Sequence, residues 1–278
     1  MIKSVKDNIV RLFDTREAEL PETPLGDPRL TQDALPAVSL ASAVDLTGKP
    51  RVVMTFGAGR SGKSTLLRWV VERALDRDGE TGAVLATADT LRPTLQRFFP
   101  GAIVPKQPDG LERLISRLVE LKRTAAIDFG ADASLVPLLT QVPDLQQMML
   151  DHGVEPVALY LLSPRSADLT VLMAMEAARF QPTATALILN MGTMVGQDPE
   201  AEFGQLRRHS VYKAAIERGA VEIWLPRLFA AKAVEDRGIR FRQAVAADSG
   251  MSLFDRSRVA SWLNAMDAAC APIASWLL

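Results

Sequence analysis

The stretch "VVMTFGAGRSGKSTLL", Val52 to Leu67, joins an apolar run to a glycine-rich loop and then to a run of helical character. Its spacing, Gly57 followed by four residues and then by Gly62, Lys63 and Ser64, matches a phosphate-binding loop between a strand and a helix. Glycines let the backbone turn its N–H groups inward, and a helix N-terminus adds the positive end of its dipole. The motif predicts that Lys63 reaches the β- and γ-phosphates and that the Ser64 hydroxyl binds Mg²⁺.

The composition sets bounds on the class of protein. The chain has 278 residues, 48% of them hydrophobic, with a net charge of −1 and a pI of about 6.2. A chain of this length and hydrophobic content can form one sizeable core with an appendage. Its net charge is near zero, so no global excess of charge favours nucleic acid or anionic membrane as a partner. Two histidines and one cysteine are too few for a dedicated zinc site.

The chain shows no sign of export or of membrane insertion. Cys270 is the single cysteine and has no internal disulfide partner, and the start "MIKSVKDNIVRLF" lacks the long apolar core of a secretory signal. Apolar runs such as "VALYLL" fall short of the roughly 20 residues that span a bilayer. We therefore expect a cytoplasmic protein that is not embedded in a membrane.

The order of segments predicts an arm followed by one domain. Residues 1–49 carry four prolines and little periodicity, which indicates an extended or partly disordered N-terminal arm. Residues 50–278 alternate apolar runs with helical patterns, which predicts a three-layer α/β domain, a mostly parallel twisted sheet with helices on both faces. The expected strands are 51–56, 82–88, 124–128, 155–162, 184–190 and 221–225. The expected helices are 63–77, 91–98, 109–122, 133–151, 166–179, 204–218 and 256–277.

Two aspartates end apolar runs of this predicted sheet. Asp128 closes "AAID", and an aspartate at the tip of such a strand typically holds Mg²⁺ directly or through water. Asp89 ends the run "AVLATAD", where a carboxylate could orient or deprotonate a water molecule that attacks the γ-phosphate. Capping of the following helices is the alternative role for each position.

The order of these signals resembles the ParA/MinD superfamily of P-loop ATPases, across roughly residues 51–245. The resemblance rests on "GAGRSGKST", "ATADTLRPTL", "AAIDFG", "ALILNMG" and "EIWLPRLFAAKAVEDRGIRF". It implies that Asn190, together with Pro226 and Arg227, flanks an adenine. The loop residues it implies for nucleotide binding are Gly57, Gly59, Arg60, Ser61, Gly62, Lys63, Ser64 and Thr65. Lys63, Asp89 and Asp128 would carry the reaction, and Ser64 and Asp128 would bind the metal.

One position departs from this family. Its members typically carry a signature lysine as the second loop residue, which contacts the other subunit's phosphates, whereas this chain has Ala58 there and Arg60 two residues later. Arg60 either replaces that contact across a dimer or faces solvent. The more divergent relatives associated with plasmid stability and conjugal transfer are the nearer comparison.

Two further surfaces remain open to interpretation. Between residues 201 and 242 the sequence has nine Lys/Arg against five Asp/Glu, which is compatible with non-specific DNA contact through 207–242 or with an ordinary solvated face. The last helix places Val259, Trp262, Leu263 and Met266 on one face and has no basic residue after Arg258. That pattern favours packing on the sheet over membrane binding.

These observations predict a molecular switch that binds Mg·ATP, hydrolyses it slowly to ADP and phosphate, and changes its partner or its oligomeric state. We expect a nucleotide-dependent homodimer, or a complex with another protein, in plasmid partition, stability or conjugal transfer. A P-loop kinase acting on a small molecule and a nucleotide-binding module with vestigial ATPase activity are the alternatives.

Overall fold

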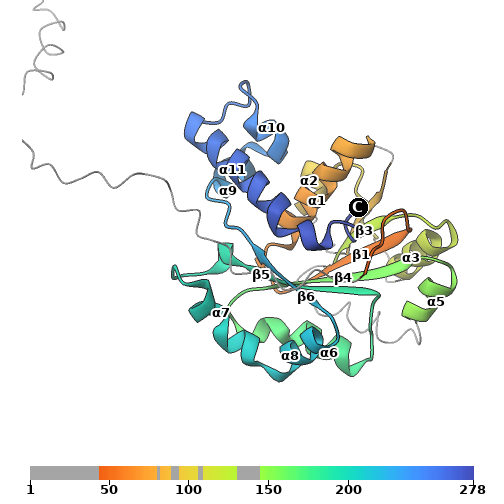
Figure 1. Ribbon diagram of the computed structural model, residues 1–278. Coiled ribbons are helices and arrows are strands. Elements are labelled where there is room, and N and C mark those ends of the chain that lie inside the picture. The colour runs from red at the N-terminus through yellow and green to blue at the C-terminus, as the bar shows by residue number, and fades with distance from the viewer. Residues whose placement is uncertain (1–43, 80–81, 89–93, 106–108, 130–144) are drawn as a thin grey trace, which may run out of the picture. The chain divides into compact units, whose positions relative to one another are not determined.

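Six parallel strands form one open sheet in the order β2-β3-β1-β4-β5-β6 (Figure 1). The strands are β1 Arg51–Phe56, β2 Val84–Thr87, β3 Ala125–Asp128, β4 Glu155–Leu162, β5 Ala184–Asn190 and β6 Val221–Leu225. In this computed structural model the described residues are 44–79, 82–88, 94–105, 109–129 and 145–278. All six strands fall where the sequence predicts them, because each is an apolar run that the sheet buries.

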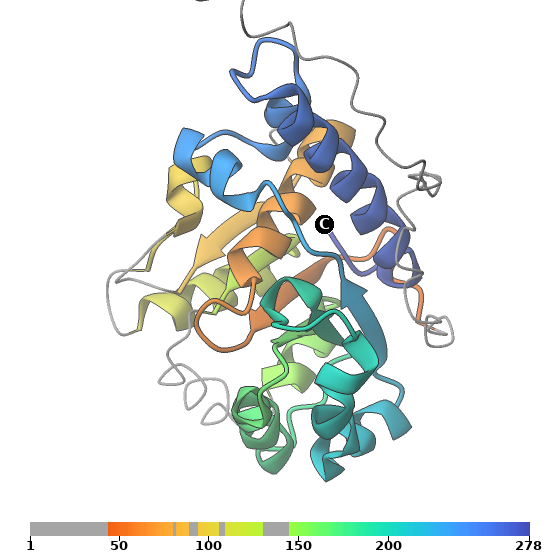
Figure 2. The ribbon, with the colours of Figure 1, turned by 90° about the vertical axis from the view of Figure 1, so that its left-hand side faces the viewer.

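Ten helices are described around this sheet within those residues. They are α1 Lys63–Asp78, α2 Thr94–Phe98, α3 Gly110–Glu120, α5 Leu145–Asp151, α6 Thr170–Ala177, α7 Pro199–Arg208, α8 Ser210–Glu217, α9 Ala231–Arg237, α10 Phe241–Val245 and α11 Leu253–Ala269. Helices α1 and α11 lie on one face of the sheet, and α6 and α8 lie on the other (Figures 1 and 2). The predicted three-layer α/β class with a parallel sheet is confirmed.

Some helix boundaries differ from the prediction. The single helix expected at 204–218 is two helices, because His209 is extended and its Nδ1 accepts the N–H of Val211 at 3.3 Å. The helix expected at 256–277 begins at Leu253, since the Ser252 hydroxyl caps it by accepting the Asp255 N–H at 3.1 Å. Helices α9 and α10 were not predicted, and Gly238 separates them in a left-handed conformation.

Helix α1 begins at the phosphate-loop motif and is anchored by a buried acid and a buried base. The Glu72 carboxylate accepts the backbone N–H groups of Phe241 at 2.9 Å and Arg242 at 3.0 Å, at the start of α10. The Arg68 guanidinium lies 3.4 Å from the centroid of the Phe98 ring and 4.2 Å from that of Phe241. Burial raises the pKa of Glu72 and lowers the pKa of Arg68 to about 10. These contacts fix α1 against α2 and α10.

The last helix packs on the domain, as its pattern predicts. Val259, Trp262, Leu263 and Met266 are buried, and the Trp262 indole N–H donates to the Pro226 carbonyl, 3.0 Å away, just after β6. Across the part of the chain that the structure describes, we find no helix with the length and apolar character that crossing a membrane requires.

Residues 44–49 precede β1 and contact the C-terminal segment. Leu46 is fully buried, and the Trp276 indole N–H donates to the Val44 carbonyl at 2.9 Å. The Arg51 guanidinium donates to the carbonyls of Leu46 and Leu277. The predicted arm otherwise falls outside the described residues, which begin at Val44.

We predict that Glu72→Ala lowers the free energy of unfolding by roughly 2–4 kcal/mol, because it leaves one buried and one partly buried N–H group without their acceptor. Chemical denaturation monitored by circular dichroism measures the change. Glu217→Ala is the matched control, since Glu217 is exposed at the end of α8, and it should change stability by less than about 0.5 kcal/mol. Equal effects of the two substitutions would contradict the anchoring role of Glu72.

Candidate functional site

The glycine-rich loop leaves the carboxyl end of β1 at the centre of the sheet. The Phe56 ring stacks on Phe129 and Tyr160, with centroids 5.0 and 5.2 Å apart, which fixes the last residue before the loop. Gly57 follows with φ 146°, and a Cβ there would lie 2.4 Å from the Leu161 carbonyl oxygen. Only glycine fits this position, so the first glycine of the motif is required by the approach of β4.

The loop and the first turn of α1 present a group of unused backbone donors. The Ser61 N–H donates to the Ala58 carbonyl at 3.2 Å and closes a turn. The N–H groups of Gly59, Arg60, Gly62, Ser64 and Thr65 donate to no acceptor among the described residues. Such a cluster at the N-terminus of a 16-residue helix is a candidate binding site for an anion.

Ser61 adds a buried hydroxyl to these donors. Its residue is 1% exposed, and its Oγ has no hydrogen-bond partner within the part of the chain that is described. An unpaired buried polar group costs free energy, so its presence inside an anion-binding loop needs an explanation. A ligand that supplies the missing partner is the simplest one.

The Lys63 side chain is buried and lies back across the loop. Its ammonium group donates to the carbonyls of Gly57 at 2.7 Å and Ala58 at 2.8 Å. A cation is therefore already placed at the loop that carries the free N–H groups.

A carboxylate and a hydroxyl meet beside the loop. The Ser64 hydroxyl donates to Asp128 Oδ2 at 3.1 Å, and the Thr55 hydroxyl lies 3.4 Å from Asp128 Oδ1. Strand pairing explains this arrangement, because Thr55 of β1 and Asp128 of β3 are in register. Both oxygen groups are hard ligands of the kind that Mg²⁺ prefers. The sequence predicted Ser64 and Asp128, whereas the contribution of Thr55 appears only with the register.

Asn190 ties the loop to the end of β5. Its Nδ2 donates to the Ser61 carbonyl at 2.7 Å, and its Oδ1 accepts the Gly192 N–H at 2.8 Å. Gly62 has φ 100°, and a Cβ there would lie 2.4 Å from Asn190 Nδ2. Asn190 thus supports the loop backbone directly, a role that the sequence did not predict.

The other residues expected at a base-binding site lie at the same edge of the sheet. Asn190 is in register with Leu225, so Pro226 and Arg227 follow β6 beside it. Arg227 is exposed, and its guanidinium lies 5.4 Å from the ring centroid of Phe229. Asp89, the predicted water-orienting residue, lies outside the described residues.

A second polar cluster follows β4 and was missed in the sequence. The buried Asp168 carboxylate accepts the Ser163 N–H at 2.9 Å as well as its hydroxyl, and Arg165 lies 3.5 Å away. Only the motif "SPR" directly after the apolar run 155–162 could have indicated it. The cluster fixes the loop that follows the strand against which Gly57 packs.

Several basic residues of 207–242 are paired within the protein. Ion pairs join Arg207 to Glu200 and Glu222, Arg218 to Glu176, Lys232 to Asp236, and Arg242 to Asp76. This pairing supports the solvated-face interpretation, and DNA contact by this segment stays an untested prediction.

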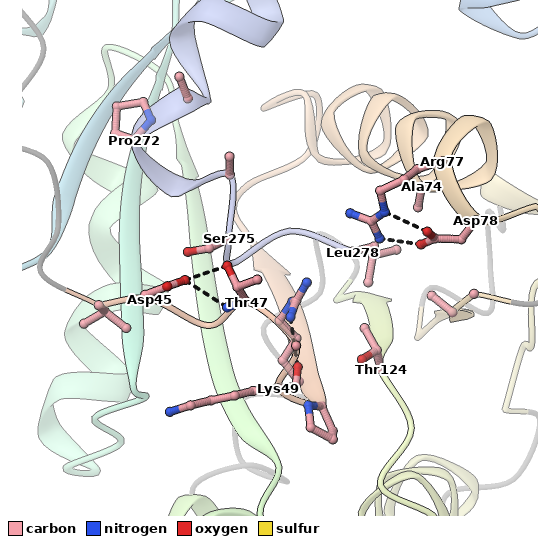
Figure 3. A pocket seen from close by; sticks show the side chains of 18 residues that line it. Asp45, Thr47, Lys49, Ala74, Arg77, Asp78, Thr124, Pro272, Ser275 and Leu278 are labelled. Atoms are coloured by element: carbon pink, nitrogen blue, oxygen red, sulfur yellow. Dashed lines mark hydrogen bonds and ion pairs between the residues drawn. The ribbon is translucent and has the colours of Figure 1, made fainter.

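A cavity of about 870 Å³ lies at the opposite end of the sheet, where β1, β2 and β3 begin (Figure 3). Two of its polar pairs are Asp45 with Thr47 and Arg77 with Asp78. Ligands of open α/β sheets bind at the carboxyl ends of the strands. The glycine-rich loop, and not this cavity, is therefore the candidate site.

We predict that Gly62→Ala lowers the free energy of unfolding by roughly 2–4 kcal/mol, through a left-handed φ and a clash with Asn190. Gly48→Ala is the matched control, because Gly48 also has a positive φ, 73°, but has open space around its Cβ position. It should cost about 1 kcal/mol. Urea denaturation of both variants measures the difference, and equal losses would show that the Asn190 contact is not tight.

Comparisons with known proteins find similar folds among solved structures. No family model and no curated protein match the chain. The solved structure of the cell division protein FtsY of Thermotoga maritima is similar at 14% identity and a TM-score of 0.41, over 67% of this chain and 65% of that one. Two structures of the signal recognition particle receptor FtsY from Elizabethkingia anophelis, the first in complex with GDP, have TM-scores of 0.38 and 0.37 at 16% identity. These two matches cover 66% and 78% of this chain, and 58% and 66% of the other chains. The chain therefore spans less than two thirds of the length of each of the three relatives.

Proposed function

We propose that this protein binds Mg·ATP at Gly57–Thr65 and acts as a nucleotide-controlled switch. The observation that carries the proposal is the group of unpaired N–H donors around the loop, together with the buried, unpartnered Ser61 hydroxyl. Donors converging at a helix N-terminus favour a phosphate chain over a neutral ligand.

Three side chains would hold the phosphates and the metal. Lys63 would exchange its contacts with the loop carbonyls for the β- and γ-phosphates. Ser64 and Asp128 would hold Mg²⁺, which, when bound, neutralises phosphate charge. Such sites bind Mg²⁺ through one or two protein ligands plus the phosphates, so one carboxylate and one hydroxyl are sufficient.

The base and the reaction rest on the resemblance to ParA/MinD ATPases. Asn190, Pro226 and Arg227 would flank adenine, which favours ATP over GTP. Asp89 would orient the attacking water molecule. The products would be ADP and phosphate, formed slowly, because phosphoryl transfer by such a site depends on positioning more than on covalent chemistry.

The switch would act on a partner through α1. That helix begins in the phosphate loop and is fixed to α2 and α10 by Arg68 and Glu72, so a change at the loop has a rigid path to the outer helices. The readout would be ATP-dependent formation of a homodimer, or of a complex with another protein, in plasmid partition, stability or conjugal transfer.

We predict that Lys63→Ala weakens ATP binding at least roughly 100-fold, since it removes the buried cation of the loop. Isothermal titration calorimetry with ATP, GTP and ADP in the presence of Mg²⁺ measures affinity and base preference together. Lys232→Ala is the control, because Lys232 is exposed and pairs with Asp236 in α9, and it should leave affinity unchanged.

Unchanged ATP affinity in Lys63→Ala would refute the phosphate site. Equal affinity of the unmodified protein for ATP and GTP would refute the adenine pocket alone. Phosphate release without any acceptor supports the switch, whereas transfer to an acceptor from a small-molecule panel would identify a kinase, and binding without turnover a vestigial site.

We predict that Asp128→Asn makes ATP binding nearly independent of Mg²⁺ and stops hydrolysis, because the substitution keeps the shape of the side chain but removes its charge. Affinity titrations with Mg²⁺ and with EDTA, and phosphate release, test this. Asp248→Asn, at an exposed position after α10, should keep the metal dependence of the unmodified protein. Full metal dependence in Asp128→Asn would exclude it as a metal ligand.

A further inference from the structure

Arg60 adopts a backbone conformation that arginine normally avoids. Its φ is 65°, in the left-handed region. The other two non-glycine residues with positive φ within the described ranges are Lys122 and Arg179. Each follows the C-cap residue of a helix, α3 or α6, where a left-handed residue commonly ends a helix. Arg60 has no such helix before it, so its conformation needs another explanation.

The turn around Arg60 shows where the strain arises. The Ser61 N–H bonds the Ala58 carbonyl, so Gly59 and Arg60 are the two central residues of a turn. The positive φ falls on Arg60 and not on Gly59. A positive φ at the third residue of a turn is normally supplied by glycine or asparagine, so arginine at this position costs free energy.

Nothing in the described part of the chain accounts for that cost. The Arg60 side chain is exposed, and it makes no hydrogen bond or ion pair with any described residue. Its own N–H and those of Gly59 and Gly62 are unpaired beside it. The guanidinium is thus an exposed cation, without a described partner, at the rim of the glycine-rich loop.

We infer that the Arg60 side chain contacts the polyphosphate bound in its own loop and slows its release. This rests on the proposed function. Lys63 supplies a point charge from within the loop, whereas a guanidinium offers a planar fork that bonds two phosphate oxygens at once. The attraction between the Arg60 guanidinium and the ligand grows with the negative charge of the polyphosphate. Arg60 therefore makes the site favour a triphosphate over a diphosphate.

The test measures release of inorganic tripolyphosphate and pyrophosphate, and of ATP, from the full chain with Mg²⁺. We expect Arg60→Ala to release tripolyphosphate and ATP about tenfold faster and pyrophosphate less than that, and Arg60→Lys to be intermediate. Arg179→Ala is the matched control, because Arg179 is also an exposed arginine in the left-handed region, and it should release all three ligands at the unmodified rate.

A second comparison separates strain from binding. Arg60→Gly and Arg179→Gly should both melt about 1–3 °C higher than the unmodified protein, since glycine relieves a left-handed residue. Only Arg60→Gly should also lose tripolyphosphate affinity. A higher melting temperature with weaker binding shows that the loop keeps arginine for its ligand and not for its fold.

Three results would overturn the inference. Failure of the unmodified protein to bind tripolyphosphate and ATP would refute the proposed function and this role with it. Binding that is equal in the unmodified protein and in Arg60→Ala would refute this role alone. Normal release by Arg60→Ala, combined with loss of an ATP-dependent dimer, would assign the guanidinium to a partner subunit instead.

Discussion

The packing of the loop backbone against three neighbouring strands is the constraint on which the candidate site depends. Gly57 meets the Leu161 carbonyl of β4, Ser61 is held by Asn190 at the end of β5, and Ser64 bonds Asp128 of β3. Each contact follows from the parallel register of these strands with β1 or with one another. A shift of one residue in any pairing would move these groups to the other face of the sheet and dismantle the loop.

The same loop continues into α1, which contacts the start of α10 through a buried carboxyl group. Glu72 is buried, and its pKa is raised because burial outweighs the two N–H groups that it accepts. A raised pKa means that the acid contributes more stability when protonated, below its unfolded pKa, and that this contribution is lost as the pH rises through its folded pKa. Burying the Glu72 carboxyl group therefore costs more stability than burying a neutral side chain would. In exchange, its hydrogen bonds fix α1, and with it the loop, to the start of α10.

The sequence was sufficient for the sheet because its strands are buried apolar runs, which periodicity detects without knowledge of tertiary contacts. The placement of Lys63, Ser64 and Asp128 around the loop could also be predicted, because their spacing and strand-end positions are local features. Their roles in binding stay predictions. Helix boundaries were less predictable, since the break at His209 depends on one side chain accepting one N–H group. The support of Ser61 by Asn190 required the spatial meeting of residues 129 positions apart, and no local pattern encodes such a contact.

Two unfavourable local features, an unpartnered buried hydroxyl and a left-handed arginine, lie next to each other in the glycine-rich loop. Only two buried side-chain polar atoms in the described residues lack a partner, and one is the Ser61 hydroxyl; the other, Arg68 Nε, belongs to a guanidinium that lies against two aromatic rings. Within the described ranges, the single left-handed non-glycine residue outside a helix end is Arg60, the immediate neighbour of Ser61. In a sequence that is otherwise consistent with its fold, such conflicts mark functional positions. An anion bound at the loop would give the Ser61 hydroxyl a partner and the Arg60 guanidinium a counter-charge, so one ligand accounts for both departures.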